Sequence, residues 1–168
     1  MLLTVGHGTH EQDAFTALLR GAGVTTLVDV RTAPGSRRYP WFGRDALAAW
    51  LPEAGIAYEH ERALGGFRKP LPGSPNAGWR NESFRGYADY MRTEPFWTAL
   101  DGVLALAGQV AVMCSESVWW RCHRRLVADA AQVVREVPVE HLMPDGRTSP
   151  HRPTEGVRRD GELLVYPG

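Results

Sequence analysis

Five short apolar segments alternate with segments of helical periodicity along this chain, and this alternation constrains the fold more than any other feature. Strands that alternate with helices form α/β domains, in which helices cover a largely parallel sheet. We therefore predict an α/β fold with three layers and a largely parallel sheet of about five strands. The predicted strands cover residues 2–5, 25–30, 56–60, 109–114 and 138–142.

The segments between these strands carry apolar residues at helical spacing, as Phe15, Leu18 and Leu19 illustrate in the first of them. Near the C-terminus, Asp160-Gly161 separates two short segments and predicts a hairpin-like tail. A chain of 168 residues suits one domain, which we expect to span residues 1–168 with a core in 1–143 and the tail in 144–168. The predicted helices cover residues 11–21, 44–54, 83–92, 95–107 and 121–135.

Composition and charge exclude several classes of protein. The apolar fraction of 43% and the charged fraction of 23% are ordinary for a globular protein. The formal net charge of zero gives no global attraction to nucleic acid or membrane, so anion binding must come from local clusters. We see no secretory signal and no apolar run near the roughly 20 residues that cross a bilayer. Two cysteines without an export signal fit a reducing cytoplasm, so we expect a cytoplasmic protein with no membrane partner.

Segment 110–129 (VAVMCSESVWWRCHRRLVAD) holds most of the residues that can carry chemistry. Its pattern predicts an apolar strand, then a polar and aromatic loop, and then the start of a helix. Open α/β folds bind ligands where strands end and helices begin. Such a position attracts anions and lowers the pKa of a thiol. The candidates in this segment are Cys114, Glu116, Cys122, His123 and Arg124.

Polar side chains also follow the first two predicted strands. His7 comes after the first strand, and Asp29 and Arg31 come at the end of the second. Because the carboxyl ends of parallel strands lie at one edge of the sheet, we expect these residues near the same crevice as the cysteines. Their joint placement predicts a functional site at this edge of the sheet.

Two chemistries fit this group of residues. In the first, Cys114 or Cys122 is a nucleophile and His123 or His7 is its base. In the second, two cysteines and one or two histidines bind zinc or iron, although the spacing lacks the C-x2-C pairing of common zinc sites. We assign no metal ligand and leave the cofactor open. The loop also misses the C-x5-R pattern of cysteine phosphatases, because Trp120 stands where the arginine belongs.

Aromatic residues alternate with arginines in the predicted loops, most densely in residues 37–44 (RRYPWFGR). Aromatic faces beside cationic side chains suit a nucleotide or a single nucleic-acid strand. We therefore add Arg37, Arg38 and Trp41 to the candidate substrate-binding residues.

Several motifs, taken in order, resemble the bacterial and archaeal family called "domain of unknown function 488". They are VGHGT, LVDVRTAPGSRRYPWF, LGGFR, VAVMCSESVWWRCHRRLVAD and VEHL, and they cover most of residues 3–142. The final PHRPT…GELLVYP resembles the tail of many members. The resemblance implies a compact α/β domain and a site, but no reaction. The family's characteristic positions match Gly6, His7, Asp29, Arg31, Arg37, Arg38, Gly65, Gly66, Cys114, Glu116, Cys122, His123 and Arg124.

Our leading hypothesis is an enzyme that acts on a phosphate-bearing substrate, either a nucleotide or a nucleic acid. The alternatives are a non-catalytic nucleotide- or nucleic-acid-binding module and a metal protein that uses the Cys/His cluster. The sequence does not decide whether the two cysteines form a redox switch. It also does not decide the oligomeric state. The expected catalytic residues are Cys114, Glu116, His123, His7 and Asp29. The expected substrate-binding residues are Arg31, Arg37, Arg38, Trp41, Arg124 and Cys122.

Overall fold

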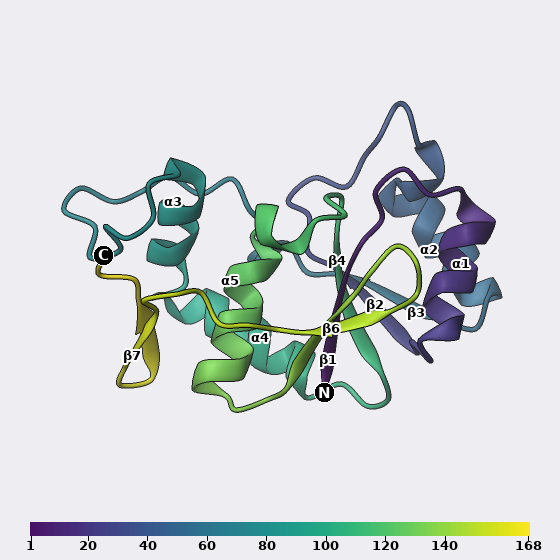
Figure 1. Ribbon diagram of the computed structural model, residues 1–168. Helices are drawn as coiled ribbons and strands as arrows, with labels where there is room; N and C mark the ends of the chain where they lie inside the picture. The colour runs from purple at the N-terminus through teal and green to yellow at the C-terminus, as the bar shows by residue number, and fades with distance from the viewer.

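A computed structural model describes residues 1–168 and contains a six-stranded sheet with helices on both faces (Figure 1). The strand order is β3-β2-β4-β1-β5-β6; the first five are mutually parallel, and β6 runs antiparallel to β5. This confirms the predicted α/β fold and largely parallel sheet, and it adds a sixth strand. The strands are β1 (Leu2–Gly6), β2 (Thr26–Asp29), β3 (Ala57–His60), β4 (Val110–Cys114), β5 (Val139–Leu142) and β6 (Thr148–Pro150).

The burial of each strand follows its place in the sheet. Every residue of β1 and β4 is buried, as expected for central strands covered on both faces. In β3, by contrast, Ala57 and Glu59 are exposed while Tyr58 and His60 are half-buried. This alternation is typical of an edge strand with one covered face, and β3 lies at the edge of the sheet.

Five helices follow the predicted segments closely. The last predicted helix starts later than expected, because Trp119–Arg121 forms a separate 3-10 turn before it. It also ends in a π-helical turn over Ala130–Val134. The helices are α1 (Gln12–Gly21), α2 (Arg44–Glu53), α3 (Glu82–Tyr90), α4 (Glu94–Leu104) and α5 (Arg124–Asp129).

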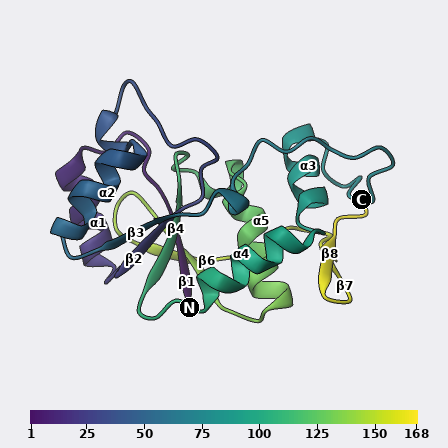
Figure 2. The ribbon, with the colours of Figure 1, turned by 180° about the vertical axis from the view of Figure 1, so that it is seen from behind.

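Helices cover both faces of the sheet (Figures 1 and 2). A hydrophobic core lies on each face and holds the layers together. On one face, Phe15 and Leu19 of α1 pack with Leu47 of α2. On the other face, α3, α4 and α5 form the larger core, which includes Leu100 and Leu126. The connections between strands and helices are therefore left at the ends of the sheet, where a site can form.

The C-terminal tail forms the predicted hairpin from β7 (Arg158–Asp160) and β8 (Leu163–Val165). Its side chains enter a buried polar network centred on Asp129 in α5. His151 Nε2 lies 2.7 Å from one Asp129 oxygen, and the Tyr166 hydroxyl donates to the other at 2.8 Å. His151 Nδ1 lies 2.9 Å from Nε2 of His141 in β5. The tail thus contributes buried contacts to the domain.

None of the helices has the length and apolar character needed to span a membrane.

Candidate functional site

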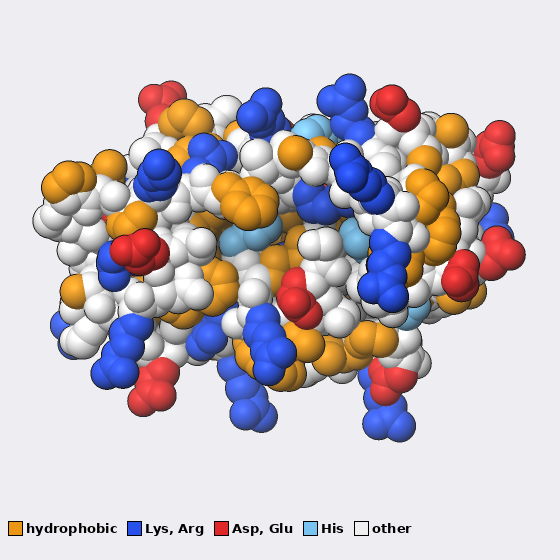
Figure 3. Space-filling model, turned by 90° about the horizontal axis from the view of Figure 1, so that it is seen from above, with side chains coloured by type: hydrophobic (Ala, Val, Ile, Leu, Met, Phe, Trp, Pro, Cys, Tyr) orange, Lys and Arg blue, Asp and Glu red, His pale blue; other side chains and the backbone are white.

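The carboxyl ends of β1, β2 and β4 meet at one edge of the sheet. Gly6 is in register with Cys114, and Asp29 is in register with Met113. A cavity of about 690 Å³ opens at this edge. Figure 3 looks onto it, and histidine and apolar side chains lie in a central hollow with basic side chains around it. The sequence-predicted residues that line the cavity are His7, Arg31, Cys114, Glu116, Cys122 and His123.

The two cysteines are in contact in the wall of this cavity. Cys114 ends β4, Cys122 lies just before α5, and their Sγ atoms are 2.6 Å apart. The Cys114 thiol donates to the backbone oxygen of Glu116 at 3.5 Å. The backbone N–H of Arg124 donates to Cys122 Sγ at 3.5 Å. The two sulfurs therefore have different surroundings, a carbonyl acceptor beside Cys114 and an N–H donor beside Cys122.

His123 is oriented by a backbone group from another strand connection. Its Nε2 lies 3.1 Å from the backbone oxygen of Val30, directly after β2. A carbonyl only accepts, so Nε2 carries a hydrogen and the neutral ring keeps Nδ1 as its acceptor. Nδ1 lies 3.6 Å from Cys122 Sγ. His123 is thus placed to take the proton of the Cys122 thiol.

The surroundings push the pKa values of the two thiols apart. Burial alone would raise the pKa of Cys122, but the hydrogen bonds with Cys114 and His123 outweigh burial and bring that pKa well below its usual range. Burial and the hydrogen bond with Cys122 raise the pKa of Cys114. Our expectation from the sequence placed Cys114 among the catalytic residues and Cys122 among the binding residues. Between the two thiols, these surroundings favour ionisation of Cys122 over ionisation of Cys114.

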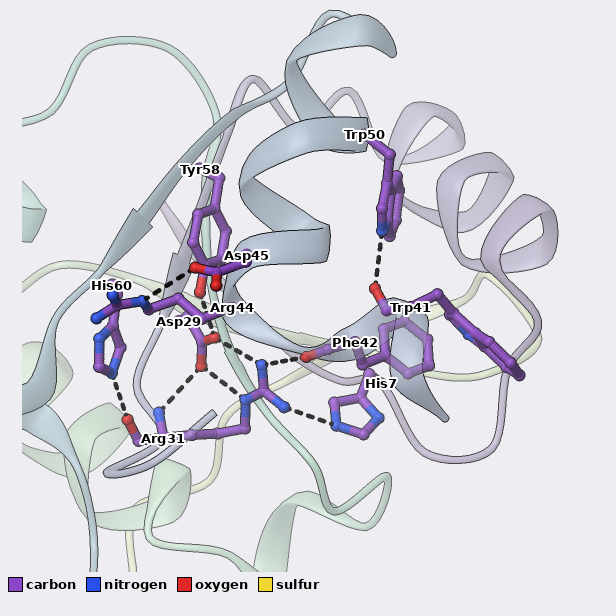
Figure 4. A network of polar contacts seen from close by, with 10 residues as sticks. All are labelled: His7, Asp29, Arg31, Trp41, Phe42, Arg44, Asp45, Trp50, Tyr58 and His60. Atoms are coloured by element: carbon purple, nitrogen blue, oxygen red, sulfur yellow. Dashed lines mark hydrogen bonds and ion pairs between the residues drawn. The ribbon is translucent and has the colours of Figure 1, made fainter. Parts of the chain in front are cut away.

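Asp29 and Arg31 form a buried ion pair next to the cavity (Figure 4). Arg31 Nη2 and Nε donate to the two Asp29 oxygens at 2.7 and 2.9 Å, and Nη2 also donates to the Phe42 backbone oxygen at 2.7 Å. The Tyr58 hydroxyl donates to Asp29 Oδ2 at 2.7 Å, and burial raises the Tyr58 pKa. Asp29 is fully buried and lies outside the cavity wall. It holds Arg31, which reaches the cavity.

His7 is fixed in the cavity wall as a neutral ring. It stacks on Phe42 with ring centroids 4.2 Å apart, and Nδ1 donates to the Gly8 backbone oxygen at 2.9 Å. Nε2 lies 3.4 Å from Arg31 Nη1, which donates to it. Burial lowers the His7 pKa to about 4. His7 therefore presents an acceptor nitrogen that is already bound by Arg31.

Arg124 holds the loop after β4 in place through a hydrogen bond. This arginine is only 1% exposed, and it donates to the Glu116 backbone oxygen through Nη2 at 2.6 Å. The Glu116 side chain accepts from the Val118 N–H at 3.0 Å while facing the cavity. Arg124 itself lies outside the cavity wall, so its guanidinium shapes the loop.

The remaining predicted binding residues, Arg37, Arg38 and Trp41, also lie outside the cavity wall. Both arginines are exposed on the loop between β2 and α2. Trp41 is half-buried, and its Nε1 donates to the His10 backbone oxygen at 3.0 Å. Its own backbone oxygen accepts from Trp50 Nε1 of α2 at 2.8 Å (Figure 4), so Trp41 connects α2 with the loop before α1.

Sequence reasoning did not assign several residues that the structure places in the cavity wall, among them Arg121, Tyr87 and Phe67. Phe67 is 90% exposed and has a positive φ of 61°, which is unfavourable for a bulky residue. The sequence feature that could have indicated Phe67 as a binding residue is its position next to an arginine, Arg68, in a predicted loop. The Tyr87 ring packs against His123, with ring centroids 5.0 Å apart. No signal in the sequence indicated that contact.

The histidine, cysteine and carboxylate side chains of residues 1–168 include no group of three or more arranged to hold a metal ion. The metal alternative therefore has no ligand set in this structure.

Comparison with known proteins places the chain in one family. The model of a family described as "Domain of unknown function DUF488" matches residues 11–131. No curated protein and no solved structure matches the chain significantly. The match covers most of the chain, including both cysteines and His123.

Proposed function

Because the chain belongs to the DUF488 family, whose description names no reaction, we propose its function from the site: a thiol-dependent enzyme that acts on a phosphate-bearing substrate with Cys122 as nucleophile. The observation that carries this proposal is the position of Cys122 Sγ. It lies 3.6 Å from His123 Nδ1 and accepts from the Arg124 N–H, in the wall of an open cavity. A cysteine activated by an oriented histidine is the arrangement that covalent thiol catalysis requires.

The proposed reaction begins with transfer of the Cys122 proton to His123 Nδ1. The sulfur then attacks an electrophilic carbon of the substrate and forms a carbon–sulfur bond. The leaving group departs with the bonding electrons and takes the proton from Nδ1. Throughout the reaction, His123 Nε2 keeps its hydrogen and donates it in a hydrogen bond to the Val30 backbone oxygen, and this bond holds the ring in place.

The charges and shape of the cavity support a phosphate-bearing substrate. Arg121 is exposed and lines it, and guanidinium groups bind phosphate well. Arg31 also lines it, although its charge is paired with Asp29. Phe67 offers an aromatic face that is 90% exposed, on which a nucleobase can stack. A backbone strained at an exposed aromatic side chain is typical of a functional position. We therefore favour a nucleotide over a smaller phosphate ester.

The first experiment measures alkylation of each cysteine by iodoacetamide, followed by peptide mass spectrometry, across pH. An ordinary thiol is about 1% ionised two pH units below its pKa, whereas we expect Cys122 to react at a nearly constant rate from about pH 6 to pH 8. His123→Asn should reduce that rate about tenfold at the acidic end. A Cys122 rate that rises tenfold per pH unit in the wild type would overturn the thiolate assignment.

The second experiment tests the substrate class through protection of Cys122 from alkylation. Inorganic phosphate and a nucleoside monophosphate should both slow the reaction in the wild type. Arg121→Ala should weaken protection by both, and Phe67→Ala should weaken protection by the nucleotide alone. The matched control is Arg147→Ala, which changes an exposed arginine outside the cavity lining. Absence of protection by either ligand would overturn the phosphate assignment. Protection combined with ordinary cysteine reactivity would favour a non-catalytic binding module.

A further inference from the structure

The proposed nucleophilic reaction uses one thiol, yet the cavity wall contains two in contact. Cys114 Sγ lies 2.6 Å from Cys122 Sγ, and the side chains are 3% and 6% exposed. A disulfide bond is about 2.05 Å long, so the sulfurs need to approach by only about half an ångström to bond. The cysteines are joined by a seven-residue loop, which Arg124 holds by its hydrogen bond to Glu116. The pair can therefore close without rearrangement of β4 or α5.

We propose that Cys122 and Cys114 form a redox-active dithiol that reduces low-molecular-weight disulfides, with Cys122 as the attacking sulfur and Cys114 as the resolving thiol. The attacking role rests on the proposed function, because it needs the same Cys122 thiolate. The resolving role rests on the contact between the two sulfurs, which the proposed function does not use. The activity is thus additional to nucleophilic attack on a phosphate-bearing substrate.

The reaction balances in two steps. In the first, the Cys122 thiolate attacks one sulfur of the disulfide R–S–S–R, a mixed disulfide forms on Cys122, and one RS⁻ departs with the bonding electrons. In the second, the Cys114 sulfur attacks Cys122 Sγ, the second RS⁻ departs, and the Cys114 proton goes to it. The dithiol loses two electrons and the disulfide gains them, giving the Cys114–Cys122 disulfide and two thiols after one RS⁻ takes a proton from solvent.

The position of the pair restricts its partner to a small molecule. Both sulfurs are nearly buried and are reached through the cavity of about 690 Å³. A short peptide disulfide fits a space of this size, whereas a disulfide within a folded protein cannot bring its sulfur to Cys122. Burial raises the pKa of the Cys114 thiol, so the resolving sulfur stays protonated until attack begins. These features distinguish the pair from two cysteines that are buried only for packing.

The test uses the full chain and glutathione disulfide as the probe. We expect one equivalent of glutathione disulfide to remove two hydrogen atoms from the wild type, by intact mass, and to release two equivalents of glutathione. Cys114→Ser should stop at a stable mixed disulfide on Cys122, and Cys122→Ser should form neither product. Oxidised thioredoxin, whose disulfide lies in a folded protein, should react far more slowly. Wild-type protein that keeps both thiols free in excess glutathione disulfide would overturn the proposal. This measurement uses only the wild type, so it does not depend on whether a variant folds.

Failure of this inference is distinguishable from failure of the proposed function. Rapid alkylation of Cys122 without disulfide formation would remove the dithiol activity and leave the nucleophile in place. Disulfide formation with an ordinary pH profile of alkylation would support the cysteine pair and overturn the activated nucleophile. Equal trapping of glutathione on Cys114 in Cys122→Ser would contradict the assigned order of attack.

Discussion

Arg124 donates through Nη2 to the backbone oxygen of Glu116, 2.6 Å away, and so fixes the loop that carries Glu116 between the two cysteines. Its Nη1 also donates to the Thr4 hydroxyl of β1 at 3.3 Å. The guanidinium is nearly inaccessible, being 1% exposed. The shape of the cavity wall therefore depends on a buried cation that lies outside that wall.

Replacing Arg124 by Met should lower the free energy of unfolding by about 2 to 3 kcal/mol, because the Glu116 oxygen loses a charged hydrogen-bond donor inside the protein. The loop would also loosen, so alkylation of Cys122 should change as well. Urea unfolding followed by circular dichroism measures the loss. Arg147→Met is the control, since this arginine is exposed and should change the free energy of unfolding by less than about 0.5 kcal/mol. Equal effects of the two substitutions would contradict the role given to Arg124.

Asp29→Asn should destabilise the protein strongly, by about 3 to 5 kcal/mol, because it leaves the buried Arg31 guanidinium without its counter-charge. The same substitution at Asp101 removes an ion pair with Arg135 at the surface, where the expected loss is at most about 1 kcal/mol. Thermal or urea unfolding of the two variants side by side makes this comparison. A mild effect at Asp29 would mean that the pair is open to solvent.

The free energy of unfolding should fall as pH drops from about 6.5 toward 4. The folded-state pKa of His7 is lowered to about 4 by burial, so between these values the unfolded chain binds a proton that the folded chain does not. The stabilisation is complete above pH 6.5, and this histidine alone accounts for a loss of about 3 kcal/mol across that range. His7→Gln should flatten the dependence by that amount in urea unfolding series. His141, whose pKa burial lowers to about 3, keeps its share of the slope in this variant. Parallel curves for the two proteins would show that His7 is not held neutral.

Gly6→Ala should damage the site as well as the fold. A methyl group at this position would lie 1.9 Å from the Glu116 backbone oxygen, so the loop after β4 must move. We expect a loss of about 1 to 3 kcal/mol in unfolding and slower alkylation of Cys122 at low pH. Gly102→Ala in α4 is the matched control, because nothing lies within 4 Å of the added methyl group. That change should stabilise the helix by about 0.5 to 1 kcal/mol.

Much of the fold could be predicted from the sequence because the central strands are buried on both faces. Their short apolar runs show no helical spacing of apolar residues, whereas the segments between them show that spacing clearly. Strand β6 escaped prediction because Thr148–Pro150 contains three residues, one of them a proline. What makes it a strand is its pairing with β5, in which Ser149 is in register with His141. No local pattern encodes that pairing.

The gathering of the candidate residues at one edge of the sheet could be predicted, whereas the direction of each side chain could not. Parallel strands bring their carboxyl ends together whatever their loops do, which is why His7 and the cysteines meet. The burial of Arg124 depends on where α5 begins, and the 3-10 turn at Trp119–Arg121 sets that point. The choice between the two cysteines depends on the His123 ring, which a backbone oxygen at Val30 orients. Both facts arise from contacts between segments far apart in the chain.

The place of β1 at the centre of the sheet has a consequence for the synthesis of this protein. Leu3 pairs with Ala111 on one side and Glu140 on the other, so both partners of this apolar strand emerge from the ribosome much later. Until then β1 has two unpaired edges, which are prone to aggregate, and its long-range pairing is slow. Strand β1 is therefore made well before both of its partners, and its two edges stay unpaired until β4 and β5 have followed.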